Sequence, residues 1–310
     1  GVVYLSERRG TDFFTLPVAL KVFSPQHYPD ARAYDEDMIR LARIAARVAQ
    51  IQHDNLLDVH NFIERNRIRI MEMEWIDGYD IRRLLSKEML SRAEQRATPE
   101  RWQYLNNVIV TAGPQQPRLK PGVAIQIVRE CLAALTALHR EGIVHGDLKP
   151  SNVMLKRTGA AKLIDIGSAI DPANAPRRRM CSPAYAAPEV LAGEEVTPQA
   201  DLASLGYVLI EMLAGCPPFA DTTTYSDLVE AKRTLAARLP RILPADVVRN
   251  EFLLNFCRRL VAADPTRRFP SAVAADLDRH GAANFHRQLI NADLASEYEY
   301  DIRVWLEVLE

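Results

Sequence analysis

The sequence predicts an α+β fold with two unequal lobes, a small β-rich lobe with one long helix and a larger lobe that is mostly helical. Three observations support this prediction. Apolar and β-branched runs dominate the first part of the chain, and the later periodic segments have helical spacing. The length of 310 residues also exceeds the size at which a single hydrophobic core stops growing.

The small lobe is predicted over residues 1–77. The runs "GVVYLSE" and "LPVALKVF" have the composition of strands, and "RIRIMEMEWI" alternates along much of its length. Between them, "ARAYDEDMIRLARIAARVAQIQ" repeats its apolar residues every three to four positions, which is typical of an amphipathic helix. We therefore expect a sheet with one helix packed on it.

The large lobe is predicted over residues 78–280, with an insertion at about 86–121. The insertion begins as helix and becomes irregular in the proline-rich "TAGPQQPRLKPG". An amphipathic helix is predicted from Pro121 to about Arg140. The segment "PQADLASLGYVLIEMLAG" is apolar on nearly all sides, as expected of a buried helix.

Residues 281–310 are predicted to form a C-terminal extension. Its last part, "ASEYEYDIRVWLEVLE", alternates from Ile302 to Val308 as a strand does, yet Val304, Trp305 and Val308 also share one face of a helix. Periodicity does not separate these two structures. Because the stretch stops without a cap, we expect the chain to be part of a longer polypeptide.

Charge and cysteine content exclude several classes of function. The chain has 39 basic and 40 acidic residues, so no overall field favours nucleic acid or an anionic membrane. It has no apolar run long enough to predict a membrane span. Its four scattered cysteines form no C-x-x-C pair, which is typical of reduced thiols in a cytoplasmic protein.

The stretch "IVHGDLKPSNVML" carries an acid, a lysine and an amide at fixed offsets: Asp147, Lys149 and Asn152. Asp165 follows in "AKLIDIGSAI". Carboxylate and amide oxygens are ligands that Mg²⁺ accepts beside phosphate oxygens. Lys149 would place an ammonium against a phosphate whose charge rises during transfer. Lys21, inside the predicted strand "VALKVF", needs an anionic partner such as a nucleotide phosphate, since burying an unpaired ammonium is costly.

Six motifs follow one another along the chain: "VALKVF", "HGDLKPSN", "DIG", "SPAYAAPE", "DLASLG" and "DPTRRF". Together they resemble a protein kinase of the bacterial Ser/Thr type, over roughly residues 1–280. The resemblance implies a two-lobed protein kinase fold that uses ATP and Mg²⁺ to phosphorylate a protein substrate. Lysine at the second position after the catalytic aspartate is the Ser/Thr form of the loop, which makes tyrosine a less favoured acceptor.

The resemblance also implies residue roles. Lys21 would pair with the α- and β-phosphates, and Asp147 would orient or deprotonate the substrate hydroxyl. Lys149 would steady the γ-phosphate, while Asn152 and Asp165 would hold Mg²⁺.

The nucleotide site follows from the same resemblance. "MEMEWIDGYD" is similar to the hinge between kinase lobes, with Met73 as gatekeeper, Glu74 to Ile76 on the adenine edge and Asp80 near the ribose. Gly1 and Val3 resemble the last glycine and the valine of the phosphate-covering loop, whose other glycines would precede this chain. The remaining nucleotide contacts implied are Ala19 and Met154.

Other matches resemble scaffolding. Glu189 and Arg268 resemble a buried ion pair, and Asp201 resembles the acid that braces the catalytic loop.

The helix departs from the family pattern, which has a glutamate that pairs with the strand lysine. The expected position holds Ile44, or Leu41 if the helix has an insertion. We nominate Glu36, with Asp37 second. This departure supports an alternative, a pseudokinase scaffold that binds a partner, through the insertion for example.

Gly146 stands where most protein kinases have an arginine, and it is shared with small-molecule phosphotransferases, which are a remote alternative. The segments "SPAYAAPEVL" and "DPTRRF" favour a protein kinase instead. Residues 165–189 would form the activation segment, the stretch whose phosphorylation switches many protein kinases on. They contain only two Ser/Thr hydroxyls, Ser168 and Ser182, and neither falls at the position usually phosphorylated. The hypothesis is that activity does not need phosphorylation of the activation segment.

Arg177, Arg178 and Arg179 lie in the same segment. Such a run is most simply a solvated loop, and the alternative is an acidic substrate or a docked acidic tail.

Overall fold

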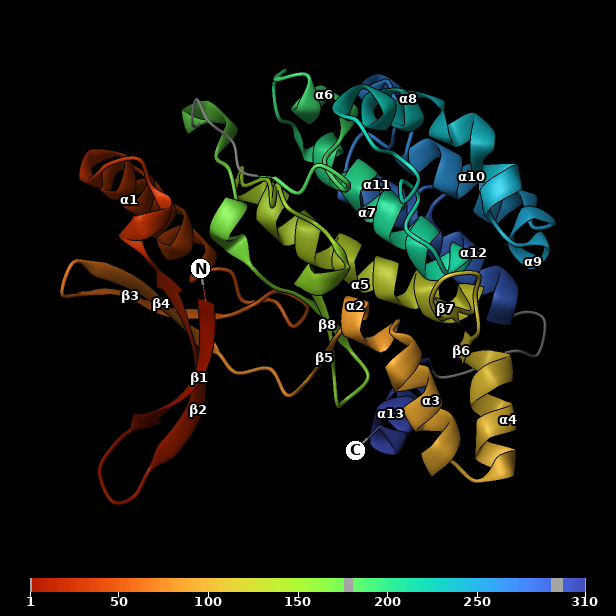
Figure 1. Cartoon of the computed structure of the whole chain (residues 1–310), viewed down its shortest axis with the longest axis horizontal. Helices are drawn as coiled ribbons and strands as arrows, with labels where there is room; N and C mark the ends of the chain where they lie inside the picture. The colour runs from red at the N-terminus through yellow and green to blue at the C-terminus, as the bar shows by residue number, and fades with distance from the viewer. Residues whose placement is uncertain (1, 176–180, 291–297, 310) are drawn as a thin grey trace.

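The computed structural model of the chain describes residues 2–175, 181–290 and 298–309. Figure 1 shows two lobes, a β-rich one formed by the N-terminal part of the chain and a larger helical one. The predicted α+β fold of two unequal lobes is confirmed.

The small lobe contains an antiparallel sheet in the order β1-β2-β4-β3. The strands are β1 (Val2–Arg9), β2 (Thr15–Phe23), β3 (Val59–Arg65) and β4 (Ile68–Glu74). The runs predicted as strands form β1, β2 and β4. Strand β3 had no clear signal, because most of its side chains are exposed or only partly buried and its sequence does not alternate cleanly.

Helix α1 (Ala31–Val48) follows a short 3-10 helix, η1 (Pro25–His27), and its apolar stripe, which includes Met38 and Leu41, is buried. The Asp30 carboxylate caps its start by accepting the N–H of Ala33 at 2.8 Å. The hydroxyl of Tyr34 donates to the Phe23 carbonyl at 2.9 Å and accepts the Arg69 N–H at 2.8 Å. The helix is thereby tied to β2 and β4.

Beyond β4 the chain enters a second antiparallel sheet, in the order β5-β8-β9. Its strands are β5 (Gly78–Asp80), β8 (Val153–Lys156) and β9 (Ala161–Leu163). The backbone of Leu163 joins this sheet to the small lobe, since it accepts the N–H of Leu57 at 2.9 Å and donates to the Asn55 carbonyl at 2.8 Å.

The helical lobe is built around α5 (Pro121–Arg140) and α7 (Pro198–Ala214). The surrounding helices are α2 (Ile81–Leu84), α6 (Pro188–Leu191), α8 (Tyr225–Ile242), α9 (Ala245–Val248), α10 (Glu251–Leu260), α11 (Ala272–Leu277) and α12 (Ala282–Ile290), with 3-10 turns η2 (Pro150–Asn152), η3 (Ile166–Ser168), η4 (Pro172–Asn174) and η5 (Pro265–Arg267). Helix α5 is long and apolar enough to cross a membrane by composition, but it is mostly buried inside the lobe, so this is weak support for a span.

Residues 86–121 form α3 (Lys87–Arg96), α4 (Pro99–Val108) and a small hairpin of β6 (Val110–Thr111) and β7 (Arg118–Leu119). Helix α13 (Tyr298–Val308) packs beside α3 and α5 (Figure 1). Arg101 donates to the Val304 carbonyl at 2.9 Å, and Trp305 is almost fully buried. The ambiguous C-terminal stretch is therefore a helix, and it covers part of the insertion.

Candidate active site

Asp201 of α7 holds the backbone at the start of the candidate catalytic loop, the stretch from His145 to Asn152. Its buried carboxylate accepts the backbone N–H groups of His145 at 2.8 Å and Gly146 at 2.9 Å, and it contacts His139 Nε2 at 2.9 Å. Burial alone would raise the pKa of Asp201, but these contacts outweigh it and lower the pKa. The predicted bracing role of Asp201 is confirmed.

Asp147 lies at the centre of a small polar cluster. Its Oδ2 accepts a hydrogen bond from Lys149 Nζ at 2.6 Å, and its Oδ1 accepts the N–H of Ser182 at 3.0 Å. Lys149 Nζ also donates to Ser182 Oγ at 3.0 Å. The acid and the lysine of the loop are thus joined to the segment "SPAYAAPE", which is far away in the sequence.

The two candidate metal ligands approach the same cluster. Asn152 is buried and its Nδ2 donates to the Asp147 carbonyl at 2.7 Å, which leaves its amide oxygen for another partner. Asp165 follows β9 with a left-handed φ of 67°, and its Oδ1 accepts the Gly167 N–H at 2.9 Å. Such a backbone conformation is uncommon for a residue with a side chain and concentrates at functional sites.

Lys21 lies on β2, as predicted, and only 8% of it is exposed. Its Nζ forms an ion pair with Asp165 Oδ1. Burial would raise the pKa of Asp165, but the Lys21 ammonium and the Gly167 N–H together lower it. The strand lysine and the candidate metal ligand therefore form one charge-balanced pair across the two lobes.

The nomination of Glu36, with Asp37 second, as the partner of Lys21 is wrong in this conformation. Glu36 is on the exposed side of α1 and pairs with Arg32 at 2.7 Å. Asp37 accepts the Tyr28 hydroxyl at 2.7 Å and pairs with Arg40 at 2.9 Å. Counting from Lys21 placed these acids by sequence distance, which does not fix the direction in which a helix turns its side chains.

Helix α1 instead presents two arginines to the segment after Asp165. Arg40 donates to the Ala169 carbonyl at 2.8 Å. Arg47 pairs with the Asp171 carboxylate at 3.0 Å and also donates to the Glu141 carbonyl. Sequence reasoning missed both, although their spacing of seven residues puts them on one face of the helix.

The gatekeeper candidate, Met73, lies opposite Ala19 in the β2–β4 pairing, and both are buried. Val3 lies opposite Lys21 in the β1–β2 pairing. The strand register therefore gathers three of the predicted nucleotide residues near the lysine. Gly1 and the run Arg177 to Arg179 lie outside the described residues.

Beyond the gatekeeper, Ile76 is buried and the side chain of Glu74 is committed to a structural contact. Its carboxylate accepts the Asp58 N–H at 2.7 Å and pairs with Lys162 of β9. Its backbone N–H also donates to the Asp58 carbonyl at 3.0 Å, so neither the carboxylate nor the N–H of Glu74 is left for a nucleotide.

Two predicted residues lie where the second sheet meets α2. The carboxylate of Asp80 accepts the Arg83 N–H at 3.0 Å and so caps α2. Met154 lies opposite Asp80 in the β5–β8 pairing. Strand pairing thus places these two residues side by side.

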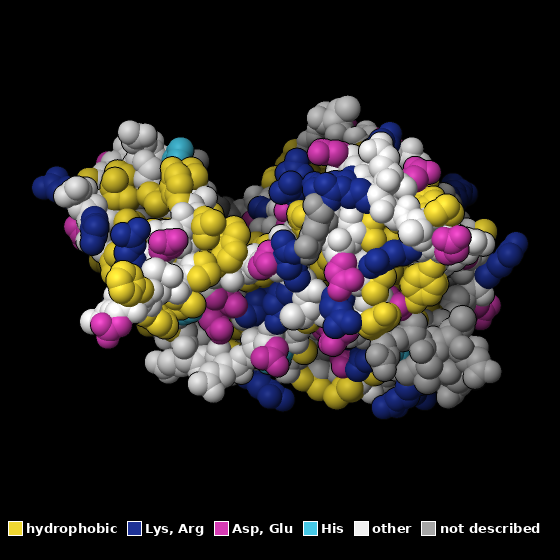
Figure 2. Space-filling view, turned by 90° about the horizontal axis from the view of Figure 1, so that it is seen from below, with side chains coloured by type: hydrophobic (Ala, Val, Ile, Leu, Met, Phe, Trp, Pro, Cys, Tyr) yellow, Lys and Arg dark blue, Asp and Glu magenta, His cyan; other side chains and the backbone are white. Residues whose placement is uncertain are grey.

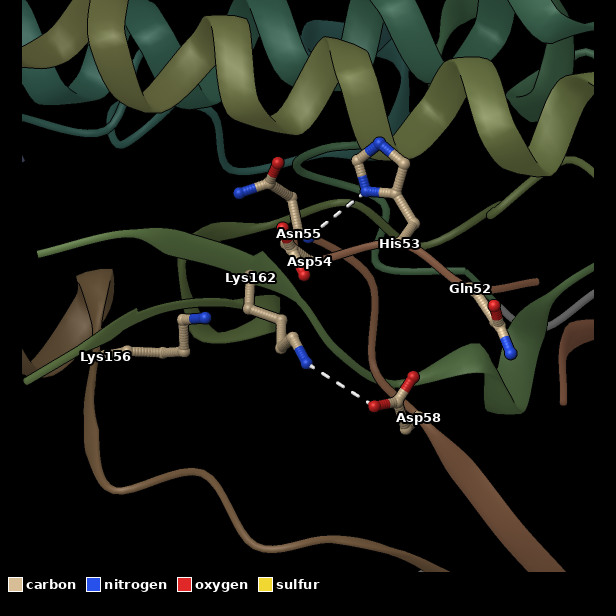
Figure 3. Close-up of a pocket in the computed structure, with 7 residues that line it drawn as sticks. All are labelled: Gln52, His53, Asp54, Asn55, Asp58, Lys156 and Lys162. Carbon is tan, nitrogen blue, oxygen red and sulfur yellow. Dashed lines mark hydrogen bonds and ion pairs between the residues drawn. The ribbon is translucent and has the colours of Figure 1, made fainter. Parts of the chain in front are cut away.

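A polar pocket of about 480 Å³ lies behind this hinge, lined by Gln52, His53, Asp54, Asn55, Asp58, Lys156 and Lys162 (Figure 3). Lys162 reaches from β9 toward Asp58 in this view. Burial and the nearby Lys162 ammonium lower the pKa of His53. The pocket shares no residue with the candidate catalytic cluster.

On the face shown in Figure 2, Lys, Arg, Asp and Glu side chains gather along the junction of the two lobes.

Gly146 adopts a left-handed φ of 77°, and a Cβ built there would lie 2.8 Å from the Ser168 carbonyl oxygen. A side chain at this position would meet both backbone strain and a close contact. Glycine therefore lets the catalytic loop approach the start of the activation segment closely.

The predicted buried ion pair between Glu189 and Arg268 is confirmed. The two guanidinium nitrogens donate to the two carboxylate oxygens at 2.6 and 2.8 Å, and both side chains are buried. This pair anchors the end of the "SPAYAAPE" segment to the turn before α11.

The two lobes and the cluster of Lys21, Asp147, Asn152 and Asp165 have the arrangement of a protein of the two-lobed kinase type. The chain belongs to the protein kinase family, since the family model described as "Protein kinase domain" matches residues 1–278. It is a kinase domain of the serine/threonine type, as its relatives show. This finding removes the small-molecule phosphotransferase alternative.

Two relatives illustrate the similarity. The chain is 32% identical over 281 residues to serine/threonine-protein kinase PknD of Mycobacterium tuberculosis (strain CDC 1551 / Oshkosh). The matched region covers 87% of this chain and 36% of PknD. The chain is also 27% identical over 305 residues to serine/threonine-protein kinase PknH of Mycobacterium bovis. The matched region covers 95% of this chain and 44% of PknH. The chain thus spans less than half the length of these relatives.

Proposed function

We propose that this domain transfers the γ-phosphoryl group of ATP to Ser or Thr hydroxyls of a protein substrate. The arrangement around Asp147 carries the proposal. Its carboxylate is held by Lys149 and by the backbone of Ser182, so the acid, the cation and the segment that would receive a peptide form one unit. Asp147 would orient the acceptor hydroxyl and take its proton, and Lys149 would stabilise the charge on the transferred phosphoryl group.

The side chains at the site suit ATP and Mg²⁺. The oxygen of Asn152 and the carboxylate of Asp165 are hard donors from two adjacent loops, the kind that Mg²⁺ accepts together with phosphate oxygens. Lys21 supplies an ammonium beside Asp165 for the nucleotide phosphates. When bound, the metal would neutralise charge on the phosphates; the residues themselves position the acceptor and hold its proton.

The Ser/Thr preference and the protein nature of the substrate are tested together. The purified chain is incubated with labelled ATP, Mg²⁺ and a mixture of candidate proteins, and the labelled amino acids are then separated after acid hydrolysis. We expect phosphoserine and phosphothreonine. Label found only in phosphotyrosine, or only in small molecules, would overturn this part of the proposal.

The domain is also proposed to act without phosphorylation of its activation segment. Asp171 supports this, because a carboxylate of the protein itself already engages Arg47. Arg40 holds the neighbouring Ala169 carbonyl, and Gly146 leaves no buried cation for a phosphate to neutralise. Phosphatase-treated protein should keep its turnover; a greatly reduced turnover after this treatment would refute the idea.

Three broader features remain proposals. Arg177 to Arg179 suggest an acidic substrate or tail. The incomplete coverage of the relatives is consistent with a longer polypeptide. The four free cysteines fit a cytoplasmic setting. The pseudokinase alternative gains no support from the relatives, which are named as serine/threonine-protein kinases.

A further inference from the structure

A buried lysine, Lys232 of α8, lies under the segment that would receive a peptide, defined here as the docking segment, residues 181–187. Lys232 is fully buried, and its Nζ donates to the Ala184 carbonyl at 2.7 Å. Among the described residues, Lys232 forms no ion pair with a carboxylate. A fully buried amine whose hydrogen-bond acceptor among the described residues is a neutral carbonyl is costly to charge, so this lysine calls for an explanation.

Two aromatic rings complete its surroundings. Lys232 Nζ lies 4.1 Å from the ring centroid of Tyr207 and 4.1 Å from that of Phe219. The two rings meet edge to face with centroids 5.1 Å apart. This arrangement is a rigid aromatic cage that aims the amine at one carbonyl of the docking segment.

The other contacts of the docking segment lie on either side of Ala184. On one side, the Ser182 N–H donates to Asp147. On the other, the Tyr185 hydroxyl donates to Glu211 of α7 at 2.6 Å. Lys232 therefore holds the backbone between the contact with the catalytic aspartate and the contact with the lobe core.

We propose that Lys232 is a positioning residue for peptide docking, which fixes the Ala184 carbonyl and through it the docking segment beside Asp147. This proposal rests on the proposed function, in that it concerns the protein substrate of the same site. The residue would act on substrate affinity and not on the nucleotide, because its contacts lie in the docking segment, α7 and the loop before α8.

Its protonation gives an independent signature. Burial lowers the pKa of Lys232 to about 7, against the weaker opposing effects of Cys181 of the docking segment and Glu189 of α6. Glu189 is itself paired with Arg268, and among the described residues that contact the Lys232 amine, the one that titrates is Tyr207, whose pKa burial raises. If opening of the segment exposes Lys232 to water, the open form binds a proton more readily than the closed one. The closed form should thus gain stability as pH rises from about 7 toward 9.

The experiment compares Lys232→Met with Arg233→Met, a control that removes an exposed cation from the adjacent position of the same helix. Initial rates are measured with myelin basic protein as the probe substrate at pH 6.5 and 8.5. At pH 8.5 we expect Lys232→Met to raise the KM for myelin basic protein about tenfold and to leave the KM for ATP within about twofold. Lys232→Gln, which keeps a donor that does not titrate, should restore part of the affinity.

A second readout does not depend on activity. Amide hydrogen exchange of residues 181–187, followed by mass spectrometry, should show faster opening in Lys232→Met than in Arg233→Met. Protection in the wild type should increase between pH 6.5 and 8.5 after correction for the intrinsic rate, and it should be flat in Lys232→Met. Equal exchange and equal KM values in the two Met variants would overturn the proposal. A wild type that does not phosphorylate any protein would refute the proposed function alone, and exchange would still decide the role of Lys232.

Discussion

Lys21 of β2 forms its ion pair with Asp165, on the other lobe, and the acids nominated on α1 point elsewhere. The helix contributes cations instead: Arg40 and Arg47 hold the chain just after Asp165. One lysine and two arginines of the small lobe thus contact the catalytic region, in addition to the backbone contacts of Leu163.

Replacement of Lys21 by methionine should reduce kcat/KM for ATP by about 100-fold or more, because it removes the ammonium that would meet the phosphates and leaves the Asp165 carboxylate uncompensated. Steady-state rates with labelled ATP provide the measurement. Glu36→Gln is the matched control, with an expected change below about twofold, since the Glu36 carboxylate pairs with Arg32 on the exposed side of α1. A loss in Glu36→Gln as large as in Lys21→Met would restore Glu36 as the functional partner.

The Arg47–Asp171 pair predicts a non-additive double mutant. Asp171→Asn should lower kcat about two- to threefold in the wild type and hardly at all in an Arg47→Ala background, because the shared contact is then already absent. Arg47→Ala also removes the hydrogen bond to the Glu141 carbonyl and should cost more than Asp171→Asn. The pair is partly exposed, so its coupling energy should be only about 0.5 kcal/mol. Strictly additive losses would show that the two side chains act separately.

Gly146 and Gly193 form a natural comparison, since both have a left-handed backbone, with φ of 77° and 78°. A Cβ at Gly146 would meet the Ser168 carbonyl oxygen, whereas a Cβ at Gly193 would meet nothing within 4 Å. Gly193→Ala should cost about 1 kcal/mol of unfolding free energy, and Gly146→Ala about 2–3 kcal/mol. Denaturant titration measures both. Equal losses would mean that the Ser168 contact is relieved at no cost.

Glu130 of α5 should make stability depend on pH. Burial raises its pKa to about 7, against hydrogen bonds from the Ala161 N–H and Gln126. Between pH 4.5 and 7 the folded state therefore binds more protons than the unfolded state, so this residue's contribution to stability falls as pH rises.

Glu130→Gln removes that titration. Relative to the wild type, the variant should gain about 1–3 kcal/mol of unfolding free energy on going from pH 5 to pH 8. Thermal or urea unfolding at both values provides the measurement. A constant difference between the two proteins would show that Glu130 keeps an ordinary pKa in the folded state.

Much of the fold follows from local pattern. The spacing of Met38 and Leu41 predicts α1, and the apolar run around Leu205 predicts the buried α7, because periodicity records which side faces the core. Periodicity did not predict strand β3, and it did not decide whether the last stretch of the chain is a strand or a helix. Trp305 explains the second case: it is buried by α13 packing near α3, some two hundred residues earlier in the chain, and no local signal contains that contact.

Part of the candidate site could likewise be predicted from local sequence, and part depends on long-range contacts. Fixed short offsets from Asp147 to Asn152 identify the catalytic loop, since the same backbone turn carries them. The partner of Lys21 depends on how the lobes meet, and the surroundings of Lys232 combine residues from α7, the loop before α8 and the docking segment. Such long-range contacts have no sequence spacing to reveal them.

The most direct test of the central claim is phosphate incorporation from labelled ATP and Mg²⁺ by the wild type and by Asp147→Ala, with both proteins checked for the same thermal unfolding profile. If Asp147 positions and deprotonates the acceptor hydroxyl, the variant should incorporate phosphate at least about 100-fold more slowly. Equal incorporation by the two proteins would contradict catalysis at this site.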